Sequence, residues 1–495
     1  MGTSLETLLH VCESEKLHLS GQIQSFGALI RLDPATRQIT HASANLGHFI
    51  DADPSRLIGQ SIDCLTWLSG EALSSLSDKP GTRQAVPGGL DGVGGPLAAM
   101  MLRGAEAAII IELEYNLSLP DPIRMEQLQS FFLSPPADDD ELGERNQQLV
   151  RGVGAITGYD RVMLYRFHGD WSGEVITEEI SGEMGGYLGQ RFPASDIPSI
   201  ARNLYLINPA RAVPDIAASP VAILGLSADP PDLTWSDLRS VSPVHLEYLG
   251  NMGVGASFSV PIRVSGRLWG LVACHHRRSR RLSPDLRSAC VTLTNLYNMG
   301  LTSYLAEDNL RNIAGLDDRI EKIGKDLSRY DDPLKAADEM ADRLVTLLNA
   351  QGFAMVAGRE AVIAGDGPDP EEIGLIDAWF LQQHGKNTAT TDHLKETLAG
   401  AGDLLARVSG LVAIKVRSER FGPVRLYWFR PSESQEITWA GDPQKPIEEK
   451  AGVVMISPRR SFEKWIEVRT GYSRPWSKLE QLTAIKLRSA LLEHL

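Results

Sequence analysis

A long stretch without proline divides this chain. Ser283–Asp285 forms a helix start, with a serine cap and a proline in the first turn, and no proline follows until Pro333. Within the stretch, apolar residues recur at intervals of three or four, namely at Leu310, Ile313, Leu316, Ile320, Ile323 and Leu327. This spacing predicts a helix of about 45 residues, roughly 70 Å long, with a coiled-coil-like seam. The alternative is an amphipathic helix interrupted at Gly300 or Gly315.

Both sides of this helix show a mixed α and β pattern. Runs typical of strands are GALIRLD, AAIIIELEY, RVMLYRF, ASFSVPIRV, GRLWGLVACHH and FGPVRLYWFRP, whereas the closing SKLEQLTAIKLRSALLEHL is typical of a helix. The polar stretch 134–144 indicates a linker. A length of 495 residues predicts about three domains. We therefore expect an α+β chain with domains at 1–118, 119–302 and 303–495.

Composition excludes several classes of function. The net charge of −14 argues against nucleic acid or an anionic membrane as the main partner. No apolar run reaches the roughly 18 residues of a membrane span, and the N-terminus lacks the pattern of a signal peptide. The cysteines, namely Cys12, Cys64, Cys274 and Cys290, lie far apart without a CxxC motif. We expect a cytoplasmic protein without disulfides or a structural metal.

One segment near the C-terminus, PRRSFEKWIEVRTGYSRPW, fits two structures. Read with a period of two, Phe462, Ile466 and Val468 share one face of a strand. Read with a period of 3.6, Phe462, Trp465 and Ile466 form a helical stripe that Ser461 could cap. We expect each structure to bury an apolar face, so the segment is predicted to switch between strand and helix.

The segment RFPASDIPSIARNLYLINPAR is the first of three that carry chemistry. Two prolines bracket Asp196, and such a stiff, irregular segment can aim main-chain carbonyls at a ligand. Arg202, Tyr205 and Arg211 follow, and arginine forks bind carboxylates. The alternative is a turn followed by a helix with solvated charges.

The other two segments add hydroxyl, aromatic and imidazole groups. Residues 239–260 contain Arg239, His245, Tyr248, Met252, Ser257 and Ser259. The histidine, the tyrosine and the methionine share one helix face, which could either line a pocket or pack in a core. In LVACHH, Cys274 and His276 point to one side of a strand and His275 to the other, so a shared metal is a weak hypothesis. Together the three segments describe one pocket for an acidic ligand with a flat apolar body.

These motifs resemble a known family. PASDIP, SPVHLEYLGNMGVGASFSV and LWGLVACHH resemble the chromophore pocket of phytochromes, and PRRSF resembles the tongue motif of their third domain. CESEKLHLSGQIQSFGAL resembles the N-terminal cysteine segment of bacteriophytochromes. The resemblance covers essentially the whole chain in the order PAS, GAF, PHY. It implies three consecutive α/β sensor domains joined by the long helix, an N-terminal knot, and a tongue hairpin at about residues 431–476.

The resemblance also implies a chromophore. Cys12 would form a thioether to the A-ring vinyl group of biliverdin, because Val244 stands where plant phytochromes carry the attaching cysteine. The Asp196 carbonyl, together with His245, would accept hydrogen bonds from the pyrrole N–H groups. His275 would hydrogen-bond the D-ring carbonyl. The family pattern is departed from at Ser25-Phe26, at Gln190 and in WAGDP, residues 439–443.

The remaining expected pocket residues surround the propionates and the D-ring. One propionate would be bound by Arg211, Arg239 and Tyr205. The other would be bound by Ser257 and Ser259. The D-ring would be walled by Tyr165, Phe192 and Tyr248, and the pocket would also include Ile197, Ser242 and Met252. From the tongue, Arg459 would reach the carboxylate of Asp196, and Ser461 and Trp465 would belong to the same switch.

The implied function is red/far-red light reception. A D-ring photoisomerisation would refold the tongue, and a parallel homodimer, held by the predicted seam, would pass the signal to an output domain beyond residue 495. That domain could be a histidine kinase acting on a response regulator, whereas this chain is expected to be no enzyme. One alternative is a GAF-type sensor of a small molecule or tetrapyrrole without photochemistry. A thiol enzyme using Cys12 is disfavoured, because Glu13 and Glu15 would raise the cysteine pKa.

Overall fold

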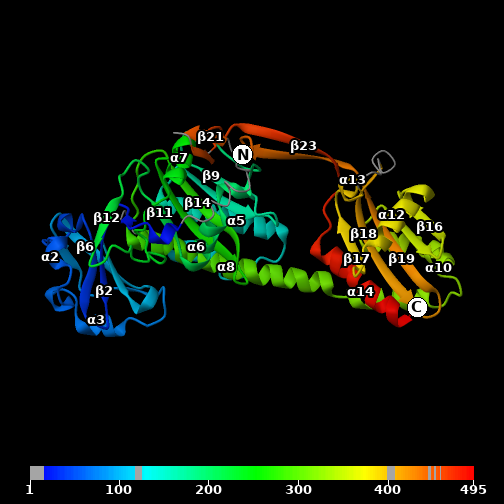
Figure 1. The fold of residues 1–495 in the computed structure, drawn as a ribbon, viewed down its shortest axis with the longest axis horizontal. Coiled ribbons are helices and arrows are strands. Elements are labelled where there is room, and N and C mark those ends of the chain that lie inside the picture. Colours follow the sequence, from blue (N-terminus) through cyan, green and yellow to red (C-terminus); the bar gives the residue numbers. More distant parts are fainter. Residues whose placement is uncertain are drawn as a thin grey trace. The chain divides into compact units, whose positions relative to one another are not determined.

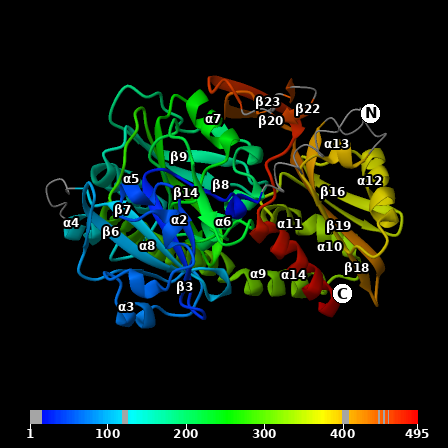
Figure 2. The same ribbon diagram turned by 60° about the vertical axis from the view of Figure 1, so that its left-hand side comes forward.

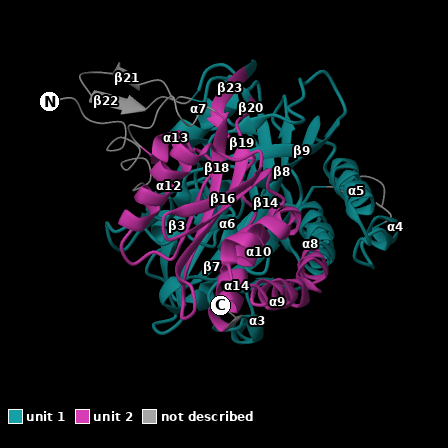
Figure 3. Ribbon diagram, turned by 90° about the vertical axis from the view of Figure 1, so that its right-hand side faces the viewer, with its two compact units in different colours: residues 1–304, 438–465 teal, residues 305–437, 466–495 magenta. Residues whose placement is uncertain are grey.

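A computed structural model describes residues 16–117, 125–398, 407–443, 447–450, 453–456 and 459–494. It divides into two compact units (Figure 3). The first unit contains Met1–Tyr304 and Thr438–Trp465, and the second contains Leu305–Ile437 and Ile466–Leu495. Helices and sheets are mixed in both units (Figures 1 and 2), so the predicted α+β class is confirmed.

The N-terminal part of the first unit is built on one sheet. Its strand order is β1-β12-β3-β2-β7-β6-β4, with β5 paired to β6. The strands are β1 (Gln22–Ile23), β2 (Gly27–Asp33), β3 (Gln38–Ser43), β4 (Arg83–Ala85), β5 (Leu90–Gly92), β6 (Gly95–Arg103), β7 (Ile109–Tyr115) and β12 (Val221–Gly225). Short helices α2 (Pro54–Leu57) and α3 (Gly70–Ser75) accompany it, and α4 (Met125–Ser130) follows. The runs GALIRLD and AAIIIELEY are β2 and β7, as predicted.

Strand β12 comes from a long insertion far along the chain. It lies between β1 and β3, pairing Ala222 with Gln22. The neighbouring backbone continues this contact, because Leu233 N donates to His18 O at 2.8 Å and Gln24 N donates to Leu238 O at 2.7 Å. The start of the described chain thus lies against the insertion, and the threading that the resemblance implies stays a prediction.

A second sheet carries several of the expected pocket residues, and its last two strands, β20 and β23, contain residues of both units. Its order is β11-β13-β14-β8-β9-β10-β20-β23. These strands are β11 (Arg211–Val213), β13 (Ala256–Val264), β14 (Arg267–His276), β8 (Arg161–Phe167), β9 (Gly173–Ile180), β10 (Arg191–Phe192), β20 (Glu433–Ala440) and β23 (Lys464–Tyr472). Helix α5 (Asp139–Thr157) packs on β8 and β9, whereas α6 (Ser199–Ile207) packs on β13 and β14. The tongue joins this sheet where Arg191 pairs in parallel with Trp439.

A long helix is present, as predicted, but the prediction that it runs unbroken for about 45 residues is wrong. Helix α8 (Pro284–Ile313) begins as expected, with Leu286 N donating to Ser283 Oγ at 3.3 Å. Gly315 then has a φ of +73°, and α9 (Leu316–Leu327) begins after it. A left-handed residue cannot continue an α-helix, and glycine adopts that conformation without steric cost. The helix therefore breaks at one of the two glycines named in the alternative.

The predicted seam is also wrong as a continuous surface. Leu310 is 68% exposed, whereas all four seam residues of α9 are buried, namely Leu316, Ile320, Ile323 and Leu327. They pack in the core of the second unit with α14 (Lys478–His494), which also forms where the sequence predicts it. The 3/4 spacing in α9 thus reflects an ordinary amphipathic helix on its own core.

The second unit is a five-stranded sheet between two cores. The sheet order is β16-β15-β19-β18-β17, and β19 is the predicted FGPVRLYWFRP strand. The strands are β15 (Gly352–Ala357), β16 (Glu360–Gly365), β17 (Thr388–Thr391), β18 (Val408–Ser418) and β19 (Gly422–Pro431). One core is formed with α9, α10 (Pro333–Glu339), α11 (Ala341–Leu347) and α14. The other is formed with α12 (Pro370–Gln382) and α13 (Leu394–Thr397).

Two further strands lie in the tongue. β21 (Ile447–Lys450) and β22 (Val453–Ile456) pair with each other in an antiparallel hairpin. Together with β20 and β23 they give the tongue a strand structure. Among the helices of the described residues, none has the length and apolar character needed to cross a lipid bilayer.

Candidate functional site

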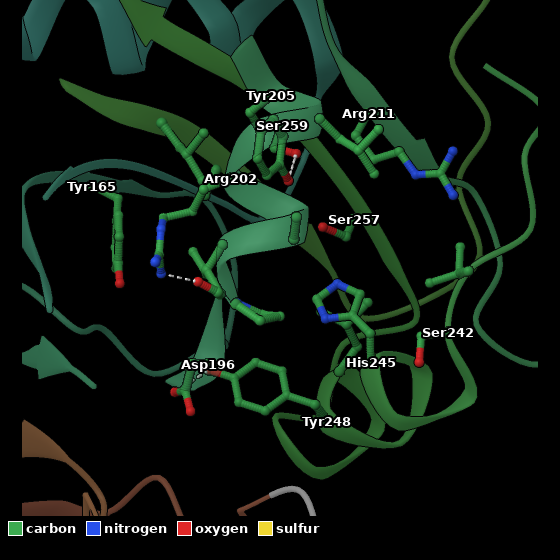
Figure 4. A pocket seen from close by; sticks show the side chains of 18 of the residues that line it. Tyr165, Asp196, Arg202, Tyr205, Arg211, Ser242, His245, Tyr248, Ser257 and Ser259 are labelled. Carbon is green, nitrogen blue, oxygen red and sulfur yellow. Dashed lines mark hydrogen bonds between the residues drawn. The ribbon is translucent and has the colours of Figure 1, made fainter. Parts of the chain in front are cut away.

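A cavity of about 760 Å³ lies in the first unit (Figure 4). Its walls come from β8, β13, β14 and α6, from α7 (Pro243–Asn251), and from the 3-10 helix η5 (Ala194–Asp196). The cavity is lined by each expected pocket residue that the structure describes, namely Tyr165, Phe192, Asp196, Ile197, Tyr205, Arg211, Arg239, Ser242, His245, Tyr248, Met252, Ser257, Ser259 and His275. Cys12 lies outside the described residues.

One end of the cavity is basic and carries hydroxyl groups. Strand pairing sets Arg211 opposite Ser259, and the Ser259 Oγ lies 2.7 Å from the Tyr205 Oη. Arg211 donates to the Arg239 and Ser240 carbonyls at 2.6 and 3.0 Å. The Arg239 guanidinium donates to the Leu233 and Thr234 carbonyls at 3.3 and 3.0 Å, so both guanidinium groups are held on backbone oxygens. This fixes two cations beside each other.

The electrostatics of this end favour an anion. Burial lowers the pKa of Arg211, and burial together with the charge of Arg211 lowers the pKa of Arg239 to about 9. Arg239 therefore still carries its charge at neutral pH, in a site where desolvation and a like charge both oppose it. A carboxylate ligand would relieve both effects, so the donor set fits an acidic group.

The Asp196 segment is held from two sides. Arg202, on α6, donates to the Ile197 carbonyl at 2.5 Å and the Ala194 carbonyl at 3.4 Å. Its guanidinium lies 4.6 Å from the centre of the Trp171 ring. Arg202 is therefore not a solvated helix charge, and that alternative is wrong for this residue. Its role is to order the backbone next to Asp196.

The tongue contacts this segment through Arg459. Arg459 is 2% exposed, and its guanidinium donates to the Asp196 carboxylate and to the Ala440 carbonyl. Tyr248 Oη donates to the same carboxylate at 3.0 Å, and Asn251 Nδ2 donates to the Arg459 carbonyl at 3.0 Å. The expected ion pair between tongue and pocket is present.

Two further tongue residues seal the contact. The Phe462 ring stands edge-on to the Tyr248 ring, with centroids 5.1 Å apart. Gly441 has a φ of +84°, and a Cβ there would lie 2.0 Å from the Ser461 carbonyl oxygen. Glycine is thus required for the close approach of the two tongue strands. This glycine lies in the WAGDP sequence that departs from the family pattern.

The switch residues Ser461 and Trp465 occupy a strand-type tongue. Ser461 Oγ accepts a hydrogen bond from Glu463 N at 3.4 Å. Trp465, Ile466 and Val468 are 39%, 50% and 56% exposed. The predicted apolar strand face is buried only in part, because Phe462 packs against a core whereas Ile466 and Val468, on the edge strand β23, stay half exposed.

The two histidines face the cavity from different elements. The His245 and Tyr248 rings stack on α7 at 6.0 Å, so this helix face serves the cavity rather than a sealed core. His275 on β14 pairs directly with Arg161 on β8, and Arg161 Nη2 lies 2.9 Å from His275 Nδ1. Burial, and then the charge of Arg161, hold the pKa of His275 well below its usual range.

Sequence reasoning missed Arg161 although a signal existed. In RVMLYRF, alternation places Arg161, Met163 and Tyr165 on one face of the strand. Met163 and Tyr165 line the cavity, and an arginine on that face is out of place in an apolar wall. The same strand also explains Gly173, since a Cβ at that position would lie 1.8 Å from the Tyr165 ring.

Comparisons with known proteins identify the same family along nearly the whole chain. Three family models match in order: a PAS fold at residues 12–116, a GAF domain at 141–299 and a phytochrome region at 318–495. Cyanobacterial phytochrome B of Nostoc sp. is 32% identical over 97% of this chain and 65% of its own length. A bacteriophytochrome of Pseudomonas aeruginosa is 30% identical over 97% of this chain and 66% of its own length. The chain thus spans about two thirds of the length of these relatives.

Solved structures show the same arrangement. The Stigmatella aurantiaca phytochrome photosensory core module has a TM-score of 0.80 at 28% identity, covering 97% of both chains. A bacteriophytochrome from R. palustris has a TM-score of 0.78 at 27% identity, covering 98% of both chains.

The fold and the cavity together define a three-domain sensor of the PAS–GAF–PHY type. The chain belongs to the phytochrome family. This is a family of light photoreceptors, and membership implies a linear tetrapyrrole chromophore.

Proposed function

We propose that this chain is the light-sensing part of a red/far-red photoreceptor and that its cavity holds biliverdin. The observation that carries the proposal is the division of the cavity into two ends. The buried Arg239, the half-buried Arg211 and several hydroxyl groups form one end, and Tyr165, Phe192 and Tyr248 line the other. Biliverdin has two carboxylates on a long conjugated body, which matches this division. When bound, it would supply red-light absorption and a double bond that can isomerise.

The protein groups would then act by position. Arg211, Arg239 and Tyr205 would orient one propionate, and Ser257 and Ser259 the other. The Asp196 carbonyl, held in place by Arg202, would accept pyrrole N–H groups together with His245. His275 would face the D-ring carbonyl. Each of these assignments is supported by the location of the residue on the cavity wall.

An absorption spectrum of the protein mixed with biliverdin tests the proposal. We expect a band in the red that shifts on illumination. A bound pigment whose spectrum does not respond to light would instead support a tetrapyrrole sensor without photochemistry. His275→Ala should keep the adduct but change the spectrum or the conversion yield, whereas Arg239→Ala should weaken binding. Equal loss of binding in both variants would contradict this division of roles.

We propose that attachment is a thioether at Cys12. The N-terminal cysteine segment and the valine at position 244 support this assignment. Two of the other cysteines are poor nucleophiles for it, because burial raises the pKa of Cys274 and of Cys290. Cys12→Ala should bind biliverdin without a denaturation-stable adduct. If the denatured variant still carries pigment, the assignment fails.

The tongue would transmit the signal by refolding. Arg459 ties the strand form to the Asp196 carboxylate, and Ser461 lies close in sequence to replace it when the segment becomes helical. The exposed Trp465, Ile466 and Val468 support this, because apolar side chains left in solvent favour a structure that covers them. Light-minus-dark infrared spectra should show a strand-to-helix amide I change that Arg459→Ala abolishes. Identical amide I bands in both states would refute it.

A parallel homodimer and a downstream output domain complete the proposal. The family supports dimerisation, and the relatives extend well beyond the part that this chain matches. The output domain would be, for example, a histidine kinase that acts on a response regulator. With the seam of α9 buried, the exposed side chains of α14, namely Leu482, Ile485 and Leu492, are the better supported contact surface. Sedimentation at micromolar concentration should show a dimer, and a monomer at that concentration would contradict the proposed homodimer.

A further inference from the structure

Arg161 is a buried cation beside the cavity that the proposed function does not use. It is 2% exposed and begins β8, directly across from His275 on β14. Residues paired across two strands point to the same face of the sheet. The Arg161 guanidinium therefore reaches the imidazole from the side, and its Nη2 lies 2.9 Å from His275 Nδ1.

This contact determines where the histidine carries its proton. A guanidinium has only N–H donors and keeps its charge in proteins. Its partner Nδ1 must therefore be an acceptor without a proton. A neutral imidazole with an unprotonated Nδ1 carries its hydrogen on Nε2. The cation form is disfavoured as well, because burial, Arg161 and His245 all lower the pKa of His275.

Arg161 itself is held by a loop between β9 and β10. Its guanidinium donates to the Gly185 carbonyl and lies 4.3 Å from the centre of the Tyr187 ring. Glu178, on β9, accepts from the Tyr187 and Leu188 N–H groups at 3.0 and 3.2 Å, which fixes the loop in turn. The guanidinium is thus positioned from three sides before any ligand enters.

We propose that Arg161 is a positioning residue that locks His275 as the neutral Nε2–H tautomer, so that the cavity meets a hydrogen-bond donor at this point. The inference deepens the proposed function. The role of this donor rests on that function, because the D-ring carbonyl of the proposed chromophore requires a hydrogen-bond donor. The tautomer itself is a property of the protein alone. It can be measured without any chromophore.

The test is ¹⁵N spectroscopy of the full chain labelled in its histidine rings. His275→Gln identifies the His275 signals by their loss. In the unmodified protein we expect a neutral ring at neutral pH, with a proton on Nε2 and a hydrogen-bonded Nδ1. In Arg161→Met, the Nδ1 resonance should move to the position of an unbonded nitrogen, and the pKa of His275 should rise because a neighbouring cation is lost. Arg161→Lys should restore the original spectrum in part.

A matched control separates this effect from a general change in β8. Arg166 lies on the same strand, is exposed, and faces the Trp269 ring, so Arg166→Met should leave the His275 signals unchanged. The proposal is overturned if the unmodified protein carries its proton on Nδ1, or if Arg161→Met leaves the His275 signals in place. If Arg161→Met does not fold, the wild-type and Arg161→Lys spectra still decide.

Adding biliverdin to the labelled protein distinguishes the two proposals. A change in the His275 Nε2 resonance on binding supports both. If no pigment binds, the proposed function fails, whereas the tautomer seen in the protein alone still stands or falls on its own spectrum.

Discussion

Replacing Arg459 by methionine should loosen the tongue residues of the first unit. The guanidinium is nearly fully buried and donates to the Asp196 carboxylate and the Ala440 carbonyl. Methionine has a similar length but no donor. The variant leaves the negative charge of Asp196 in a site where its side chain is 2% exposed, with the Tyr248 hydroxyl as a neutral donor at 3.0 Å.

The size of the effect follows from the burial of the pair. Breaking a buried ion pair by removing one partner costs about 3–5 kcal/mol. Opening of the tongue returns the Asp196 carboxylate to water and so removes most of that cost. The substitution therefore lowers the free energy of opening by most of this amount. At about 1.4 kcal/mol for each factor of ten, opening should become about 10²–10³ times more frequent.

Hydrogen exchange measures this opening directly. The Trp439 segment, which pairs with Arg191 on β10, should exchange faster by about that factor, whereas the exposed neighbour variant Arg460→Met should behave like the wild type. Combining Arg459→Met with Asp196→Asn should restore much of the protection, because a neutral amide needs no cation. Unchanged exchange at Trp439, or purely additive effects of the two substitutions, would refute the reasoning.

Three further predictions concern stability. Gly173→Ala should lower the free energy of unfolding by about 1–3 kcal/mol in chemical denaturation, because its Cβ would overlap the Tyr165 ring. Gly315→Ala should lower it by about 1 kcal/mol through left-handed strain, whereas Gly300→Ala, inside α8 with room for a Cβ, should raise it by about 0.5–1 kcal/mol in thermal unfolding. Burial, reinforced by a neighbouring carboxylate, raises the pKa of Glu112 from 4.5 to about 7. The folded state then holds a proton that the unfolded state has lost, so stability should fall as the pH rises through this window, and Glu112→Gln should flatten that slope.

Each of these predictions has a matched comparison. A Cβ at Gly169 would meet no atom within 4 Å, so coincident denaturation curves for the alanine variants at 169 and 173 would contradict the overlap argument. Equal stabilisation by alanine at 300 and 315 would mean that the helix can run through the break. If the stability of the wild type and of Glu112→Gln falls equally with rising pH, the pH dependence of stability belongs to another group.

The strands and the pocket could be predicted because their signals are local. RVMLYRF and ASFSVPIRV alternate as strands do, and the structure forms both where the sequence places them. The residues around Asp196 and His245 were found because polar groups cluster there within a few positions. Arg161 was missed because no other charged residue shares its face of the strand. Its meaning depends on His275, which is remote in the sequence and adjacent only in the sheet.

The features that escaped prediction depend on non-local packing. Apolar spacing of three and four fits both a continuous helix and a helix that ends at Gly315, and the core of the second unit decides between them. The exposed face of β23 could not be predicted either, because the pattern at Ile466 and Val468 shows which residues share a face and not whether anything covers it.

The place of β12 has a consequence for synthesis on the ribosome. β1 is joined to its sheet only by pairing with β12, among the strands that the structure describes. The N-terminal sheet therefore cannot be completed when Tyr115 emerges, since β12 ends at Gly225. At a synthesis rate of about 5–20 residues per second, the nascent chain would wait on the order of 10 seconds with the edge of β3 unpaired. During that interval the first domain offers an open strand edge to chaperones or to a neighbouring nascent chain.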